Sequence, residues 1–284
     1  MGPLALLLFL ALLQGLTEYL PVSSSGHLVL ARLFLPGGER LPDDATLEVW
    51  LHLGTLGAVL SFYRREIGAM LAGLLGRGSD PAAERRLALL LVLGSIPAAV
   101  IGLGLEDTIE AAFAGPGTAA CGLLITGCFL WYSRRLSAVT HGPTELAPSA
   151  ERLASAAGFG ARVALIIGCA QALAIMPGIS RSGATIVTAL FLGLSIERAA
   201  AFSFLLSIPA VGGAAILKLP DMLSADAAAS APHLSHLLLA LMTAFLVGLA
   251  ALKLLLGIAR SRRLHWFAPY CWIMGALALL ASFG

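Results

Sequence analysis

Two polar stretches interrupt an otherwise apolar chain: Gln14-Gly-Leu-Thr-Glu-Tyr-Leu-Pro-Val-Ser-Ser-Ser-Gly-His27 (cassette 1) and Gln171-Ala-Leu-Ala-Ile-Met-Pro-Gly-Ile-Ser-Arg-Ser-Gly-Ala-Thr185 (cassette 2). They contain the only two glutamines of the chain, which lie 157 positions apart (171 − 14), and the same offset pairs serines and glycines of the two cassettes. Matched polar segments in two apolar halves are typical of a membrane protein whose repeats build one buried site. The sequence therefore predicts a duplication.

The composition indicates an integral membrane protein. Hydrophobic residues make up 58% of the 284 residues and charged residues only 12%, whereas soluble domains contain about 25% charged residues. The net charge of +2 is not gathered in one basic patch, so nucleic acid is not expected as a partner. The four cysteines lie in apolar stretches without the spacing of a metal site, and we expect them to be packing residues.

Six apolar runs approach the roughly 20 residues that a helix needs to cross a bilayer. They cover residues 46–63, 87–105, 117–132, 200–217, 234–252 and 266–283. Two shorter runs end at the cassettes and have the length of re-entrant segments. We therefore predict an all-α fold of about ten helices, in which each half is a re-entrant helical hairpin followed by three transmembrane helices. Because three spans are an odd number, the second half is inverted relative to the first.

The basic residues orient this arrangement. Of the 18 Lys and Arg residues, all but four fall on one side of the membrane, which the positive-inside rule makes cytoplasmic. Both termini are then expected on the periplasmic face. The chain divides into a first inverted repeat (1–135), a cytoplasmic linker (136–160) and a second inverted repeat (161–284), which form a single membrane domain. We expect the cassettes to meet near mid-membrane, because non-helical backbone at that depth must line a polar cavity.

Three ionisable residues of the cassettes are functional candidates because charges inside a membrane are costly: Glu18, His27 and Arg181. Arg181 offers a fork of donors suited to phosphate, and each cassette precedes a helix whose free N–H groups would face a bound anion. Two linked phosphates would fit between the two helix starts. The positions predicted to bind the substrate are Ser23, Ser25, Gly26, Gly178, Ser180, Ser182 and Thr185.

A carboxylate beside a bound anion is repulsive unless the two share a cation. Mg²⁺ is commonly held by one or two carboxylates together with phosphate oxygens, and Ca²⁺ is the alternative. Gln14 lies one helical turn before Glu18, so these two residues are the predicted metal ligands. His27 is the predicted proton-transfer group, and the nucleophile is either a serine, for which we favour Ser24, or a metal-bound water. The predicted reaction is hydrolysis of a phosphoric anhydride or ester of a lipid.

A family resemblance rests on Gln14-xxx-Glu18, on Pro-Val-Ser-Ser-Ser-Gly-His27 and on Pro177-Gly-Ile-Ser-Arg-Ser-Gly-Ala-Thr185. With these motifs the whole chain resembles the bacitracin-resistance family of undecaprenyl-diphosphatases. The resemblance implies an inner-membrane enzyme that hydrolyses undecaprenyl diphosphate to undecaprenyl phosphate and inorganic phosphate, which recycles the lipid carrier of peptidoglycan synthesis and confers bacitracin resistance. It also implies a divalent cation and catalytic roles for Glu18, Ser24, His27 and Arg181. Gln14 stands where the family often has Glu, which removes one anionic metal ligand.

Some alternatives stay open at this point. A polyprenyl-phosphate flippase or transporter would have the same inverted repeats and the same buried phosphate site. The type 2 phosphatidic acid phosphatase class is excluded, because Val187 occupies the position at which its Ser-Arg-x5-His pattern needs histidine. Undecaprenyl diphosphate and membrane lipid are the expected partners, and a homodimer is left open. Glu48 and His52 lie four apart at the start of a span, where they fit either a support of the site or a contact at the membrane boundary.

The orientation gives a first prediction. A cysteine introduced at Asp43 should react with a membrane-impermeant thiol reagent added to intact cells, because the loop is placed outside, whereas one at Ser149, in the cytoplasmic linker, should not. Labelling is read by a mass shift, with permeabilised cells as the control in which both positions react. The opposite pattern would reverse the orientation.

Overall fold

The computed structural model describes residues 3–34, 45–113, 115–136, 153, 159–222 and 233–282. Every regular element in these ranges is a helix. The helices are α1 (Pro3–Tyr19), α2 (Ser24–Phe34), α3 (Ala45–Phe62), α4 (Arg64–Leu74), α5 (Pro81–Gly104), α6 (Glu106–Phe113), α7 (Pro116–Leu136), α9 (Ala161–Leu173), α10 (Arg181–Phe191), α11 (Ile196–Met222), α13 (Leu234–Arg260), the 3-10 helix η2 (Leu264–Trp266) and α14 (Phe267–Ala281). The prediction of an all-α membrane protein is confirmed.

Four helical stretches are long and apolar enough to cross a membrane: Pro81–Gly104, Ile196–Pro220, Leu234–Arg260 and Leu264–Ala281. A fifth is added if α6 and α7, bent by 94° at their junction, count as one broken span. The sixth predicted span, 46–63, corresponds to α3, whose apolar described part (Val49–Phe62) is shorter than a full crossing. Length and composition therefore support four or five of the six predicted spans.

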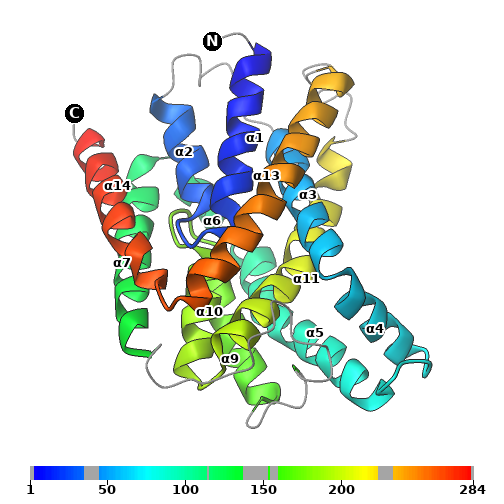
Figure 1. Ribbon diagram of the computed structural model, residues 1–284. Coiled ribbons are helices and arrows are strands. Elements are labelled where there is room, and N and C mark those ends of the chain that lie inside the picture. Colours follow the sequence, from blue (N-terminus) through cyan, green and yellow to red (C-terminus); the bar gives the residue numbers. More distant parts are fainter. Residues whose placement is uncertain are drawn as a thin grey trace.

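Two helical hairpins enter the molecule from opposite ends. Figure 1 shows α1 and α2 at the end that carries both chain termini, whereas α9 and α10 lie at the other end. The tips of the hairpins, where the two cassettes turn, approach each other in the interior. A Cβ atom added at Gly26 in the first hairpin would lie 2.8 Å from the Cα of Gly178 in the second. The cassettes, far apart in sequence, thus come into direct contact.

The first helix of each hairpin packs against a long helix of the other half. Helix α1 packs along α13 of the other half, and its counterpart α9 packs along α5. Glycines make both approaches close: a Cβ at Gly15 would lie 2.8 Å from that of Val247, and one at Gly168 only 2.1 Å from the Gly94 carbonyl oxygen. Small residues at helix contacts are how membrane proteins bring backbones together. These two matching contacts, α1 with α13 and α9 with α5, are the packing that an inverted repeat would produce.

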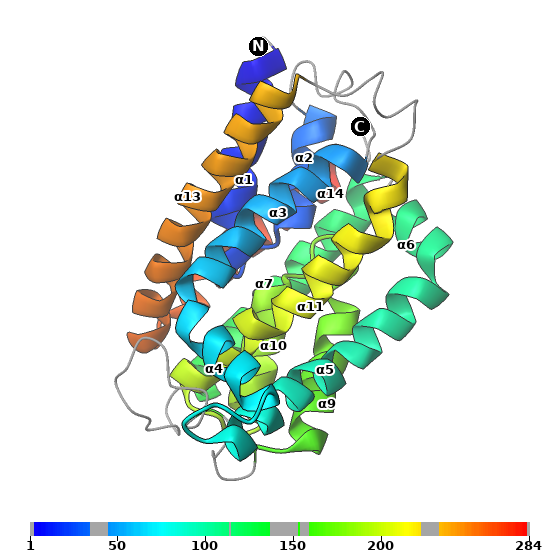
Figure 2. The same cartoon turned by 90° about the vertical axis from the view of Figure 1, so that its right-hand side faces the viewer.

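The described ranges contain twelve α-helices, two more than the roughly ten expected from the apolar runs. The additional helices are α4 and α6, which are too polar to register as spans. Arg64, Arg65 and Glu66 open α4, which follows α3 after one residue (Figure 2), and Glu106 and Asp107 open α6. Acidic residues suit a helix start because they complement its dipole. The linker predicted for 136–160 lies mostly outside the described residues, as do Asp43 and Ser149, and the division at 135 and 161 stays a prediction.

Gly178 gives a stability test of the hairpin contact. Its φ of +88° strains any residue with a Cβ, and an added Cβ would also lie 2.1 Å from the Ala119 carbonyl oxygen of α7. Gly193 has the same φ of +88° with nothing within 4 Å, so Gly193→Ala should cost only roughly 1–2 kcal/mol of backbone strain. Gly178→Ala should cost roughly 2 kcal/mol more, because backbone atoms must also move. Chemical unfolding in detergent measures both, and equal losses would refute tight packing of this tip.

Candidate active site

The first cassette ends α1 and begins α2. Between the helices Ser23 takes a positive φ of 69°, which turns the chain back within a few residues. The Ser23 hydroxyl then accepts a hydrogen bond from the Gly26 N–H at 3.2 Å, and it lies 3.2 Å from the Ser25 hydroxyl. As expected, α2 begins at Ser24. This start leaves the Ser24 side chain on the inner side of the turn, close to the last residues of α1.

The second cassette is held by α7. Ser180 caps α10, since its hydroxyl accepts from the Gly183 N–H at 3.1 Å. The Thr126 hydroxyl, on α7, accepts from the Ser180 N–H and donates to the Gly178 carbonyl, both at 2.9 Å. The predicted helix start after Pro177-Gly178 is therefore present, and a side chain from another span fixes its backbone. Arg181 is the first residue of α10 and points back toward cassette 1.

Glu18 is the centre at which the two cassettes meet. Its Oε1 lies 2.7 Å from Nη2 of Arg181, which forms a salt bridge between the hairpins. Its Oε2 accepts the Ser24 hydroxyl at 2.6 Å. Two further groups surround the same oxygen: Gln14 Nε2 donates at 3.1 Å, and His52 Nε2 lies 3.7 Å away. The Glu18 side chain, in a residue only 8% exposed, thus accepts hydrogen bonds from Gln14, Ser24 and Arg181.

His27 faces away from this centre. Its Nδ1 lies 2.7 Å from the Ser23 carbonyl, which can only accept, so Nδ1 carries a proton. Its Nε2 lies 2.7 Å from the Tyr270 hydroxyl of α14, and the two rings are parallel. The group that accepts the Ser24 hydroxyl is therefore Glu18 and not His27. His27 therefore makes no hydrogen bond with Ser24 here, and its predicted part as the proton-transfer group stays a prediction.

The remaining predicted substrate-binding hydroxyls of cassette 2 are buried and take part in local bonds. Thr185 donates to the Arg181 carbonyl at 2.7 Å and lies 2.5 Å from the Ser203 hydroxyl of α11. Ser182 donates to the Leu20 carbonyl of the other hairpin at 3.4 Å. These bonds give Ser182 and Thr185 a role in holding the hairpins. Ser25, which is partly exposed, and Arg181 are the members most open to a ligand.

Gln14 and Glu18 are the predicted cation ligands, and Gln14 turns its Nε2, not its Oε1, toward the Glu18 carboxylate. Gln14 is fully buried, and its Oε1 has no hydrogen-bond partner in the described part of the chain. Within the described ranges, no group of three or more His, Cys, Asp or Glu side chains could hold a metal ion. One carboxylate and one amide oxygen are therefore suited to Mg²⁺ only when phosphate oxygens and water complete its shell. Gln171, the counterpart of Gln14, is also buried, and neither of its amide atoms has a described partner.

Four side chains join the site from helices outside the cassettes. They are His52 of α3, Thr126 of α7, Ser203 of α11 and Tyr270 of α14. Of these, only His52 stood out in the sequence, where its role was open, and the structure places it beside Glu18. The side chain of Glu48 lies outside the described residues. Isolated polar residues within apolar spans were the available signal for the others, but nothing in the sequence says which one reaches the cassettes.

Comparison with known proteins shows which family the chain resembles. Residues 7–277 match the family model described as "Bacitracin resistance protein BacA". A protein of Desulfatibacillum aliphaticivorans named undecaprenyl-diphosphatase is 44% identical over 287 residues, which is 96% of this chain and 97% of the relative. Proteins with the same name from Rhodopirellula baltica and Korarchaeum cryptofilum are each 40% identical, and they align with 99% and 96% of this chain and with 99% and 97% of their own lengths.

The buried ion pair can be tested by stability. Arg181→Met leaves the Glu18 carboxylate buried without its cation, so unfolding free energy should fall by roughly 3–5 kcal/mol. The double variant Glu18→Gln/Arg181→Met should regain part of this loss, since no unpaired charge remains. As a matched control, Lys218→Met removes the exposed pair with Glu106 and Glu110 and should cost about 1 kcal/mol or less. Chemical unfolding in detergent measures all three, and a double variant as unstable as Arg181→Met would argue against the pairing.

Proposed function

This chain belongs to the bacitracin resistance protein BacA family, and on that basis we propose that it is an undecaprenyl-diphosphatase. It is a multi-pass membrane enzyme that hydrolyses undecaprenyl diphosphate to undecaprenyl phosphate and inorganic phosphate. The product is the lipid carrier of peptidoglycan precursors, so the reaction recycles the carrier and supports bacitracin resistance. The single observation that carries this proposal is the hydrogen bond from Ser24 to Glu18, with Arg181 beside it.

That geometry suits nucleophilic attack on the terminal phosphate. A hydroxyl bonded to a carboxylate at 2.6 Å can pass its proton to the carboxylate as the oxygen forms a new bond. Ser24 Oγ attacks the terminal phosphorus, the bond from that phosphorus to the bridging oxygen breaks, and undecaprenyl phosphate leaves. Water then hydrolyses the phosphoserine, releases inorganic phosphate and returns the proton to Ser24. Direct attack by a water, with Ser24 as a hydrogen-bond donor, is the alternative route.

Arg181 and His27 act on the charges of the reaction. The guanidinium of Arg181 has N–H donors beyond the one that binds Glu18, and these can bind the oxygens of the transferred phosphate in pairs. Once protonated, His27 carries a hydrogen on Nε2 while Nδ1 keeps its bond to the Ser23 carbonyl. In that state it can give a proton to the leaving phosphate once Nε2 is released from the Tyr270 hydroxyl. In this proposal Glu18 is the base and His27 the acid.

A divalent cation, Mg²⁺ or alternatively Ca²⁺, is part of the proposal. Glu18 would hold it together with substrate oxygens, and Gln14 Oε1 would join them once the amide turns so that Oε1 takes the place of Nε2. When bound, the cation would draw negative charge from the phosphates. The protein's own groups keep the site ordered without it, because Arg181 neutralises Glu18. Gln14 is neutral, whereas a glutamate at this position would repel the negatively charged substrate.

We place the enzyme in the bacterial inner membrane, with both termini and the opening of the site on the periplasmic side. The uneven distribution of Lys and Arg supports this orientation. Membrane lipid surrounds the protein, no nucleic acid takes part, and a homodimer remains an open alternative. A flippase is the less favoured function, because lipid transport has no need for a serine bonded to a buried carboxylate.

Phosphate release from undecaprenyl diphosphate by the purified protein tests the function directly, with Mg²⁺ and with a chelator. We expect Ser24→Ala to lower the rate by about 10³-fold or more, because it removes the nucleophile. Ser261→Ala, at the exposed end of α13, is the matched control and should retain the wild-type rate. A phosphoserine should be trapped on wild type by acid quenching.

The outcomes separate the routes. If Ser24→Ala keeps a measurable rate and wild type forms no phosphoserine, water is the nucleophile. If the folded wild type binds the lipid and releases no phosphate, the hydrolase assignment is wrong and the flippase gains support. A rate that is unchanged by the chelator would remove the cation from the mechanism.

A further inference from the structure

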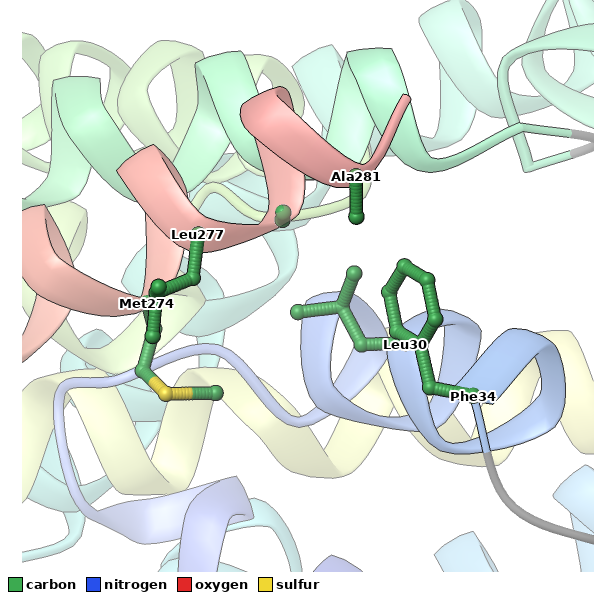
Figure 3. Close-up of a pocket in the computed structure, with 6 residues that line it drawn as sticks. Leu30, Phe34, Met274, Leu277 and Ala281 are labelled. Carbon is green, nitrogen blue, oxygen red and sulfur yellow. The ribbon is translucent and has the colours of Figure 1, made fainter. Parts of the chain in front are cut away.

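An apolar groove lies between α2 and α14, outside the polar site (Figure 3). Its volume is about 240 Å³, and its lining is Leu30, Phe34, Met274, Leu277, Ala278 and Ala281. In Figure 3 the side chains of the two helices face each other across the gap. Phe34 and Leu277 are each more than half exposed, so the groove opens at the side of the protein, where hydrocarbon surrounds a membrane protein.

The groove begins at the candidate active site. The hydrogen bond between His27 and Tyr270 joins α2 to α14 at 2.7 Å. Leu30 and Phe34 follow His27 by three and seven residues on α2, and Met274 and Leu277 follow Tyr270 by four and seven on α14. Residues at these spacings share one face of a helix. The lining of the groove therefore starts about one helical turn beyond the His27–Tyr270 pair, on the same faces of α2 and α14.

The packing of the helices explains why this gap is open. Both α2 and α14 pack along α7, and Leu30, Ala120, Leu123 and Ala278 form a small cluster that closes the floor. The matching pair is α10 of the second half and α7 of the first, and these two helices pack on each other. In the turn that leads into α10, the Pro177 carbonyl oxygen would lie 2.3 Å from a Cβ added at Gly122 of α7. The α2–α14 pair has no such extended helix contact in the described chain. The groove thus lies between α2, of the half that supplies Glu18, Ser24 and His27, and α14 of the other half.

The lining and the size of the groove suit an isoprene chain. All six lining side chains are hydrocarbon or thioether, so they offer no partner to a polar headgroup. At roughly 30 Å³ for each water-sized group, a five-carbon isoprene unit fills about 150 Å³. The volume of about 240 Å³ then holds between one and two units. Burial of apolar surface would stabilise them there.

We propose that this groove binds the first isoprene units of the substrate, next to the diphosphate, and lets the rest of the chain pass sideways into the bilayer. The proposal rests on the proposed function, since it needs a polyprenyl diphosphate whose head lies at Ser24 and Arg181. The groove then selects for a lipid tail, and the polar site selects for the diphosphate.

A kinetic comparison tests the groove. Ala281→Trp fills it, whereas Ala276→Trp adds the same side chain to the exposed face of α14 outside it. We expect Ala281→Trp to raise the KM for undecaprenyl diphosphate about tenfold, which corresponds to lost apolar contact for roughly two carbons of an isoprene unit. Its kcat/KM for methyl diphosphate, which has no tail, should stay at the wild-type value. Ala276→Trp should match wild type on both substrates.

Photocrosslinking gives a readout that does not depend on turnover. A polyprenyl diphosphate with a diazirine on its first isoprene unit should label peptides of α2 or α14. Undecaprenyl diphosphate should compete with this labelling, Ala281→Trp should reduce it, and excess phospholipid should leave it unchanged.

Several results would overturn the proposal: an unchanged KM in Ala281→Trp, an equal loss of rate on methyl diphosphate, labelling on other helices, or competition by phospholipid. Labelling of the groove without any phosphate release would support the groove and refute the proposed hydrolysis. Phosphate release together with labelling elsewhere would refute the groove alone.

Discussion

The salt bridge between Glu18 and Arg181 is the interaction on which the rest of the structure depends. It joins two hairpins that enter from opposite ends, and both partners are largely withdrawn from solvent. An unpaired charge in such a place is strongly destabilising. The charged residue at the tip of each hairpin therefore needs the opposite charge that the other hairpin supplies. Glycines at the tips and Thr126 on α7 bring the backbones close enough for the pair to form. The same pair keeps a carboxylate and a guanidinium ready for a diphosphate.

The duplicated cassettes have taken different chemical roles. Under the offset of 157, Ser24 corresponds to Arg181, while Glu18 and His27 correspond to Ile175 and Ala184. Cassette 1 thus holds the groups that can move protons, and cassette 2 holds the positive charge. Helices α2 and α14 leave a groove between them, whereas the matching helices α10 and α7 pack on each other. The two halves therefore share a plan of packing but supply different residues to the site.

The sequence by itself determined the class of fold and the parts of the site. Long apolar runs with few charges can only be membrane helices, and the polar cassettes can be tolerated in the membrane only if they meet. Ser23 and Ser180 stand just before the helices that begin at Ser24 and Arg181, and the hydroxyl of each accepts a hydrogen bond from a free N–H of the first turn. The sequence did not predict helices α4 and α6, because their charged residues exclude them from a search for apolar spans.

Only the tertiary structure decided which partners these residues take. Spacing places Ser24 and His27 on one face of α2, yet Ser24 donates to Glu18 and His27 bonds to Tyr270, which is 243 residues away. Polar residues of α3, α7 and α11 complete the site, and the groove depends on how α2 and α14 rest on α7. Local patterns fix helix starts and faces because they depend on neighbours in the chain. Contacts between distant helices depend on packing, which small residues such as Gly122 and Gly178 permit only in the folded protein.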